Sequence, residues 1–218
     1  MRITHLGHSA VLVETGASRV LIDPGNLTDA WRGVTDLDAV LVTHVHPDHL
    51  DPQHVPQLLA ANPSAYVYAE SSIPDALAAA DVNLGAMIPV AAGDDFKVGD
   101  LVVSAVGGVH AEIHRDIPRI GNVGYVLRAE GEPSLFHPGD SYATAPPGVD
   151  IVAVPLYGPW AALKETIDFV RGVGALEGFG IHEQLLNERG FGLVTGRVEA
   201  MTSSRVLDLR SGTAHHFA

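Results

Sequence analysis

The chain has 218 residues, of which 46% are hydrophobic and 18% charged, a balance typical of a compact globular protein rather than a disordered one. Its 26 acidic and 13 basic residues give a formal net charge of -13, which argues against general binding to the phosphate backbone of nucleic acids. The absence of cysteine excludes disulfide bonds and thiolate metal ligands.

The first half of the chain begins with short apolar or alternating runs that are separated by Gly7, Gly16 and Pro24-Gly25. This pattern predicts hairpin-linked strands over residues 3–6, 10–14 and 20–22. Strands and helices then alternate. We expect strands over residues 39–42, 65–68, 84–90 and 101–106, and helices over residues 52–61 and 73–80.

The second half repeats this order. Apolar runs predict strands over residues 123–128, 134–136 and 151–154, a helix over residues 160–170 and a last strand over residues 205–209. His215 and His216 are expected to lie in a disordered end. Because strands followed by helices occur twice, the pattern favours two stacked sheets with helices outside.

One domain over residues 1–218 is the simplest organisation for this length. The segment Met1 to His5 lacks the apolar core of a signal peptide. The uncharged apolar stretch over residues 151–163 contains two prolines and is shorter than the roughly 18 apolar residues of a membrane-spanning helix. We therefore expect a cytoplasmic protein with no membrane partner, while a homo-oligomer remains compatible with the sequence.

The segment His44-Val45-His46-Pro47-Asp48-His49 places three imidazoles and a carboxylate between a predicted strand and a predicted helix. Side chains two residues apart on an extended segment point to the same side, so His44 and His46 can bind one metal ion together. Asp48 and His49 follow the Pro47 bend and can reach a second position. Imidazole and carboxylate are ligands that zinc, manganese and iron accept. The alternative interpretation is a solvated histidine-rich loop.

Three later residues with suitable side chains each follow a predicted strand. His110 follows Val106-Gly107-Gly108-Val109, Asp140 follows His137-Pro138-Gly139, and His182 follows Phe179-Gly180-Ile181. Glycine before Asp140 would let the backbone pass close to a metal.

The series formed by these seven residues, in this order, resembles the metallo-β-lactamase superfamily over nearly the whole chain. The segments Ile3-Thr4-His5-Leu6-Gly7-His8-Ser9-Ala10 and Gly121-Asn122-Val123-Gly124-Tyr125 resemble a narrower branch of metal-dependent hydrolases similar to ascorbate-6-phosphate lactonase. The resemblance implies an α/β fold (α+β by some schemes), a four-layer αββα sandwich. Glu183 stands after His182, where this branch leads us to expect an aromatic residue.

The resemblance also implies roles for these residues. His44, His46 and His110 would hold one metal, and Asp48, His49 and His182 a second, with Asp140 bridging the two. The cofactors would be two divalent ions, zinc as the first expectation, with manganese or iron as alternatives. Such ions activate a bridging hydroxide, which Asp48 would help to orient as the catalytic residue. The substrate would be a small molecule with an ester, lactone, thioester, amide or phosphodiester bond.

Further residues have two interpretations each. Asp23 either orients a ligand histidine or caps a turn before proline. His8, His114 and Tyr157 either contact the substrate or are ordinary turn, loop and packing residues. Trp160 either lines the substrate pocket or simply packs, and His137 either supports a metal ligand or belongs to the core.

The competing functions are a nuclease of the same fold, a glyoxalase II-like thioesterase and a metal-binding protein without turnover. The acidic balance disfavours the nuclease. The thioesterase family carries an additional domain for which 218 residues leave little room. All seven candidate ligand residues are present, which disfavours a protein that has lost turnover. A flavodiiron-type role is disfavoured because His46 stands where that group uses a carboxylate.

Overall fold

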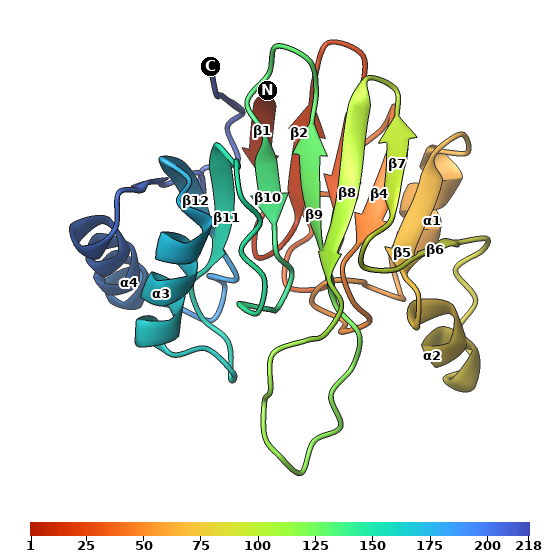
Figure 1. The fold of residues 1–218 in the computed structure, drawn as a ribbon. Helices are drawn as coiled ribbons and strands as arrows, with labels where there is room; N and C mark the ends of the chain where they lie inside the picture. The colour runs from red at the N-terminus through yellow and green to blue at the C-terminus, as the bar shows by residue number, and fades with distance from the viewer.

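A computed structural model describes residues 1–218 and shows two mixed seven-stranded sheets that pack face to face (Figure 1). The first sheet has the strand order β14-β1-β2-β3-β4-β5-β6. Its strands are β1 (Arg2–His5), β2 (Val11–Glu14), β3 (Arg19–Ile22), β4 (Ala39–Val42), β5 (Tyr66–Glu70), β6 (Ile88–Val90) and β14 (His215–His216).

The second sheet has the order β13-β12-β11-β10-β9-β8-β7. Its strands are β7 (Asp95–Val98), β8 (Leu101–Gly107), β9 (Val123–Arg128), β10 (Leu135–His137), β11 (Ile151–Pro155), β12 (Glu177–Ile181) and β13 (Arg205–Leu207). Four helices complete the fold: α1 (Val55–Ala61), α2 (Ile73–Ala79), α3 (Leu163–Val173) and α4 (Glu188–Met201).

Alternating side chains explain why the sheets lie between helices. In β2, Val11 and Val13 face a core of 23 buried residues that both sheets contribute, whereas Leu12 faces a second cluster that includes Val55 and Leu58 of α1. A third cluster joins the outer face of the second sheet to α3 and α4. The period of two along each strand therefore buries both faces of the sheets and produces the predicted four-layer αββα arrangement.

The direction of the strands brings the predicted ligands to one edge. In the first sheet, β1, β3 and β4 run in the same direction, because β2 is antiparallel to both β1 and β3 while β3 is parallel to β4. In the second sheet, β8, β10 and β12 also share one direction. The segments that follow these strands carry every predicted ligand. The long loop between β8 and β9 extends from this edge, at the bottom of Figure 1.

Several predicted boundaries were wrong. The predicted helix over residues 52–61 begins only at Val55, where a proline occupies the first turn, and the strand predicted over 84–90 is reduced to β6. The helix predicted over 160–170 is displaced to α3 because Ala162 is still extended. His215 and His216, expected in a disordered end, form β14 and pair with β1.

Two elements lack a local signal and were not predicted. Helix α4 contains three glycines, which have low helix propensity, but Asn187 caps its first turn and Phe191 and Val198 are buried against the third core cluster. Strand β7 is short and largely exposed on one side, and it forms by pairing with β8. None of the four helices combines the length and apolar character needed to cross a bilayer.

Candidate metal centre

The ligand-type side chains gather into two clusters, and in each one a donor atom from every residue lies within 4.8 Å of the others. The first cluster comprises His44, His46, His110 and Asp140, and the second comprises His8, Asp48, His49 and His182. The two clusters thus contain all seven predicted ligands, together with His8, for which sequence reasoning left open a role in contacting the substrate. These are two candidate metal sites built from histidine and aspartate.

In the first cluster, three imidazoles converge. His44 Nε2 lies 3.1 Å from His46 Nδ1, and the His110 ring lies 4.8 Å and 4.7 Å, between centroids, from the rings of these two residues. Nδ1 of His110 donates to the carbonyl oxygen of Ala111 at 2.7 Å, which leaves Nε2 of this ring facing the cluster. Burial lowers the pKa of His44 well below its ordinary value and also lowers the pKa of His46, so both rings are neutral and able to bind a metal.

The second cluster draws on both sheets. His8, Asp48 and His49 follow strands of the first sheet, whereas His182 follows β12 of the second. Asp48 Oδ2 lies 3.1 Å from His8 Nε2 and 3.5 Å from His182 Nε2. Burial alone would raise the pKa of Asp48, but the hydrogen bond from His8 and the neighbouring His49 hold it well below its usual range, so Asp48 is ionised at neutral pH.

Asp140 lies between the clusters. Its Oδ1 is 3.0 Å from His49 Nε2, and its Oδ2 is 3.1 Å from His182 Nε2 and 3.4 Å from His110 Nε2. A single carboxylate therefore contacts imidazoles of both sites, as the predicted bridging role requires. Burial opposes ionisation of Asp140, but His49 and His182 keep its pKa well below the ordinary value.

A buried hydrogen-bond network orients the ligands. Asp23 Oδ2 lies 2.7 Å from His49 Nδ1, and both carboxylate oxygens of Asp23 accept hydrogen bonds from Thr43, through its backbone N–H and its hydroxyl. Thr43 Oγ1 also lies 3.0 Å from His44 Nδ1. The contact to His49 is the one that the orienting role predicted for Asp23 requires. Burial would lower the pKa of His49, but Asp140 and Asp23 raise it well above its ordinary value.

The chemistry of the donor set fits divalent metal ions. Three buried atoms that face the clusters, His110 Nε2, His182 Nε2 and Asp140 Oδ1, make close contacts with neighbouring ligand residues but no hydrogen bond of acceptable geometry. Buried polar atoms without partners are costly, so a group that binds them would stabilise the fold. A cation between Asp140 and His49 would also take the place of the proton that the two carboxylates favour on this imidazole.

Glycine residues allow the backbone of the motif to pack closely. A Cβ atom at Gly25 would lie 1.7 Å from the carbonyl oxygen of Asp48, and one at Gly139 would lie 2.3 Å from Asn122 Oδ1. Asn122 Oδ1 accepts the backbone N–H of Asp140 at 2.9 Å. Gly25 and Gly139 therefore place the segments that carry Asp48 and Asp140 where larger residues would not fit.

The remaining predicted residues have different surroundings. His114 is 57% exposed at its side chain and pairs with Asp116 at 3.6 Å, so the structure does not bring it into either cluster. Tyr157 is 42% exposed on the segment after β11. His137 is buried, and its Nε2 lies 3.0 Å from the carbonyl oxygen of Ser9.

Sequence reasoning missed the contact of Trp160, whose Nε1 donates to Asp140 Oδ2 at 2.9 Å. It also missed the roles of Thr43 and Asn122, although Thr43 directly precedes the metal motif and Asn122 lies in a segment already noted for its resemblance.

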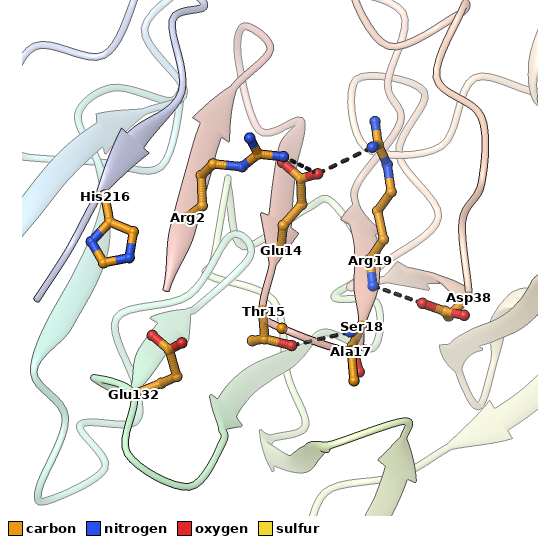
Figure 2. A pocket seen from close by; sticks show the side chains of 10 residues that line it. Arg2, Glu14, Thr15, Ala17, Ser18, Arg19, Asp38, Glu132 and His216 are labelled. Atoms are coloured by element: carbon orange, nitrogen blue, oxygen red, sulfur yellow. Dashed lines mark hydrogen bonds and ion pairs between the residues drawn. The ribbon is translucent and has the colours of Figure 1, made fainter.

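A cavity of about 580 Å³ lies at the opposite ends of β1, β2 and β3, away from the metal clusters (Figure 2). Arg2 and Arg19 both contact Glu14 Oε1 there, at 2.6 and 3.1 Å. Its guanidinium groups are therefore paired with a carboxylate of the protein itself, and this cavity offers no comparable group of metal ligands.

Comparison with known proteins supports the fold described above and places the chain in a family. Residues 2–175 match the family model described as "Beta-lactamase superfamily domain". The chain is 38% identical over 205 residues to Protein Rv0786c of Mycobacterium tuberculosis, covering 94% of each protein. It is also 33% identical over 156 residues to a UPF0173 metal-dependent hydrolase of Xanthobacter autotrophicus. This alignment covers 65% of this chain and 62% of that relative.

Solved structures support the fold at lower sequence identity. The metallo-β-lactamase fold protein YhfI of Bacillus subtilis superposes with a TM-score of 0.76 at 14% identity and 99% coverage of both chains. Igni18, a metallo hydrolase of Ignicoccus hospitalis, superposes with a TM-score of 0.72 at 17% identity, over 100% of this chain and 98% of that one.

Proposed function

The chain belongs to the metallo-β-lactamase superfamily and is a metal-dependent hydrolase, and from this premise we propose that it hydrolyses a small metabolite at a dinuclear centre. The observation that supports two coupled ions is the contact of Asp140 with imidazoles of both clusters. The bond attacked is an ester, lactone, thioester or phosphodiester.

The residues that would hold the ions follow the two clusters, except that His8 of the second cluster is not counted as a ligand. His44, His46 and His110 would hold one ion and Asp48, His49 and His182 the other, while Asp140 lies against imidazoles of both groups and could serve both ions. Zinc is the metal we propose, because imidazole and carboxylate suit it well, and manganese and iron accept the same donors. When bound, such ions supply an activated water and polarise the scissile group.

The protein contributes a fixed carboxylate and a shielded site. Asp48, ionised and hydrogen-bonded to His8, can accept a hydrogen bond from the attacking water and so orient it. Trp160 donates to Asp140 and keeps its carboxylate in one orientation. Beside His46 and His110, the loop between β8 and β9 lines a small cavity with Ile113, Ile117 and Arg119.

The first experiment measures metal content and hydrolysis together. Purified protein should contain close to two equivalents of metal per chain. A panel of lactones, thioesters and bis-p-nitrophenyl phosphate, assayed with added zinc or manganese, should reveal turnover. Asp48→Asn should abolish it, whereas Asp116→Asn, an exposed aspartate in the β8–β9 loop, should not.

The outcomes separate the competing functions. A protein that binds no metal would contradict every form of the proposal. Two bound metal ions without turnover on the whole panel would favour a non-catalytic metal-binding protein, and turnover confined to the phosphodiester would favour a nuclease. Equal activity of wild type and Asp48→Asn would remove Asp48 from the mechanism.

A further inference from the structure

The backbone at His8 and His182 adopts a conformation that residues other than glycine rarely take. The φ angle is +53° at His8 and +60° at His182, in the left-handed region. Both residues belong to the second cluster, and their rings lie 4.0 Å apart between centroids. Such a conformation persists only where the surrounding structure holds it in place, so each of these two residues needs a partner.

Glu183 supplies that partner for His8. Its Oε1 accepts the backbone N–H of His8 at 3.0 Å, while the backbone N–H of His182 donates to the carbonyl oxygen of His8 at 3.0 Å. The two-residue segment after β12 therefore holds both polar groups of the His8 backbone. His5 Nε2 lies 2.9 Å from the same carbonyl oxygen and 3.4 Å from Glu183 Oε2, which has no hydrogen-bond partner of its own.

This network joins the two sheets beside the second cluster, whose residues come from both sheets. His5 and His8 follow β1 of the first sheet, and His182 and Glu183 follow β12 of the second. Glu183 is only 4% exposed, so its carboxylate is removed from water and the hydrogen bonds that it accepts are strong. Without the hydrogen bond between Glu183 and the backbone N–H of His8, the ring of His8 could turn away from Asp48 Oδ2.

We propose that Glu183 is a positioning residue that locks His8 and His182 together and so preorganises the second metal site. It contacts no reacting group, and its effect passes through the backbone of His8. The inference rests on the proposed dinuclear centre. It assigns a role to the one residue of the His182 segment that departs from the expected aromatic side chain.

The test compares Glu183→Ala and Glu183→Gln with wild type by titrating zinc into chelator-treated protein in the presence of a competing chromophoric chelator. Glu183→Ala should weaken one of the two equivalents by about 10- to 100-fold, as when partners of metal ligands are removed, and leave the other close to wild type. Glu183→Gln keeps an oxygen that can accept the His8 N–H, so it should lose less than about 10-fold. Glu14→Gln, at the far end of the first sheet, should change neither equivalent.

Wild-type affinity for both equivalents in Glu183→Ala would overturn the proposal. Equal weakening of both equivalents would also overturn it, because that pattern indicates general loss of structure. Thermal unfolding of the chelator-treated variants shows whether each is folded. Should Glu183→Ala not fold, Glu183→Met carries the test, because it keeps most of the side-chain volume but offers no oxygen to accept the His8 N–H. If wild type itself binds no zinc, the proposed dinuclear centre fails first, and this outcome is distinct from a variant that behaves as wild type.

Discussion

The indole nitrogen of Trp160 donates a hydrogen bond to Oδ2 of Asp140, with 2.9 Å between the two atoms. Asp140 is the carboxylate that contacts imidazoles of both metal clusters, so its orientation affects both sites. Trp160 is 9% exposed and also lies edge-on to His110, with 6.2 Å between ring centroids. An aromatic residue far along the chain thus belongs to the environment of the candidate metal centre.

Replacing Trp160 with Phe removes the donor and keeps an aromatic ring. A hydrogen bond to a charged group contributes about 1.5–3 kcal/mol, so we expect metal affinity to fall by about 10- to 100-fold. Zinc titration against a competing chelator measures this change. Tyr157→Phe, on the same segment but 42% exposed, should leave metal affinity unchanged. Unaltered affinity in Trp160→Phe would show that Asp140 needs no support from the indole.

Replacing Asp23 with Asn tests the support of His49. Asp23 is fully buried and accepts hydrogen bonds from Thr43 as well as lying 2.7 Å from His49 Nδ1. Loss of such a partner typically lowers metal affinity about 10- to 100-fold. Metal content after dialysis should fall below two equivalents per chain. The matched control is Asp36→Asn, an exposed aspartate that also has a positive φ, and it should retain full metal content.

The sequence was sufficient to predict the fold and most of the candidate site, because the relevant signals are local. The motif from His44 to His49 and the glycine before Asp140 lie within short segments at strand ends. The position of His8 beside His182 could not be predicted in the same way. These residues are 174 positions apart by number, and their proximity depends on how two sheets stack, which no local pattern encodes.

Removal of metal should lower thermal stability. Chelation leaves His110 Nε2, His182 Nε2 and Asp140 Oδ1 buried without partners. A ligand at 100 times its Kd stabilises a protein by about 2.7 kcal/mol. For a chain of this size, that corresponds to a fall in Tm of about 5–11 °C on chelation. Differential scanning calorimetry with and without chelator measures the shift, and added zinc should restore it. An identical Tm in both states would argue against binding at these clusters.

The chelator-treated protein should lose stability as the pH falls below about 6.5. Burial lowers the pKa of four histidines in the folded state, namely His8, His44, His46 and His137. The unfolded chain, with histidine pKa values near 6.5, therefore takes up protons first, and acid favours unfolding. His49, whose pKa is raised, acts in the opposite sense and stabilises the fold at low pH. Because four groups oppose one, Tm at pH 5.5 should be below Tm at pH 7.5, and a higher Tm at pH 5.5 would show that His49 dominates.

A methyl group at Gly25 should disrupt the metal motif. The Cβ of an alanine there would lie 1.7 Å from the carbonyl oxygen of Asp48 and 2.0 Å from its carbonyl carbon, and backbone atoms can yield only by moving the segment that carries Asp48 and His49. We expect Gly25→Ala to destabilise the protein by about 1–3 kcal/mol and to lower metal content. At Gly33 the same substitution meets no atom within 4 Å, so Gly33→Ala controls for the added methyl group. Metal content and denaturant unfolding measured on both variants decide the matter: if Gly25→Ala matches Gly33→Ala in both, the close approach of Gly25 to Asp48 does not determine the position of the ligands.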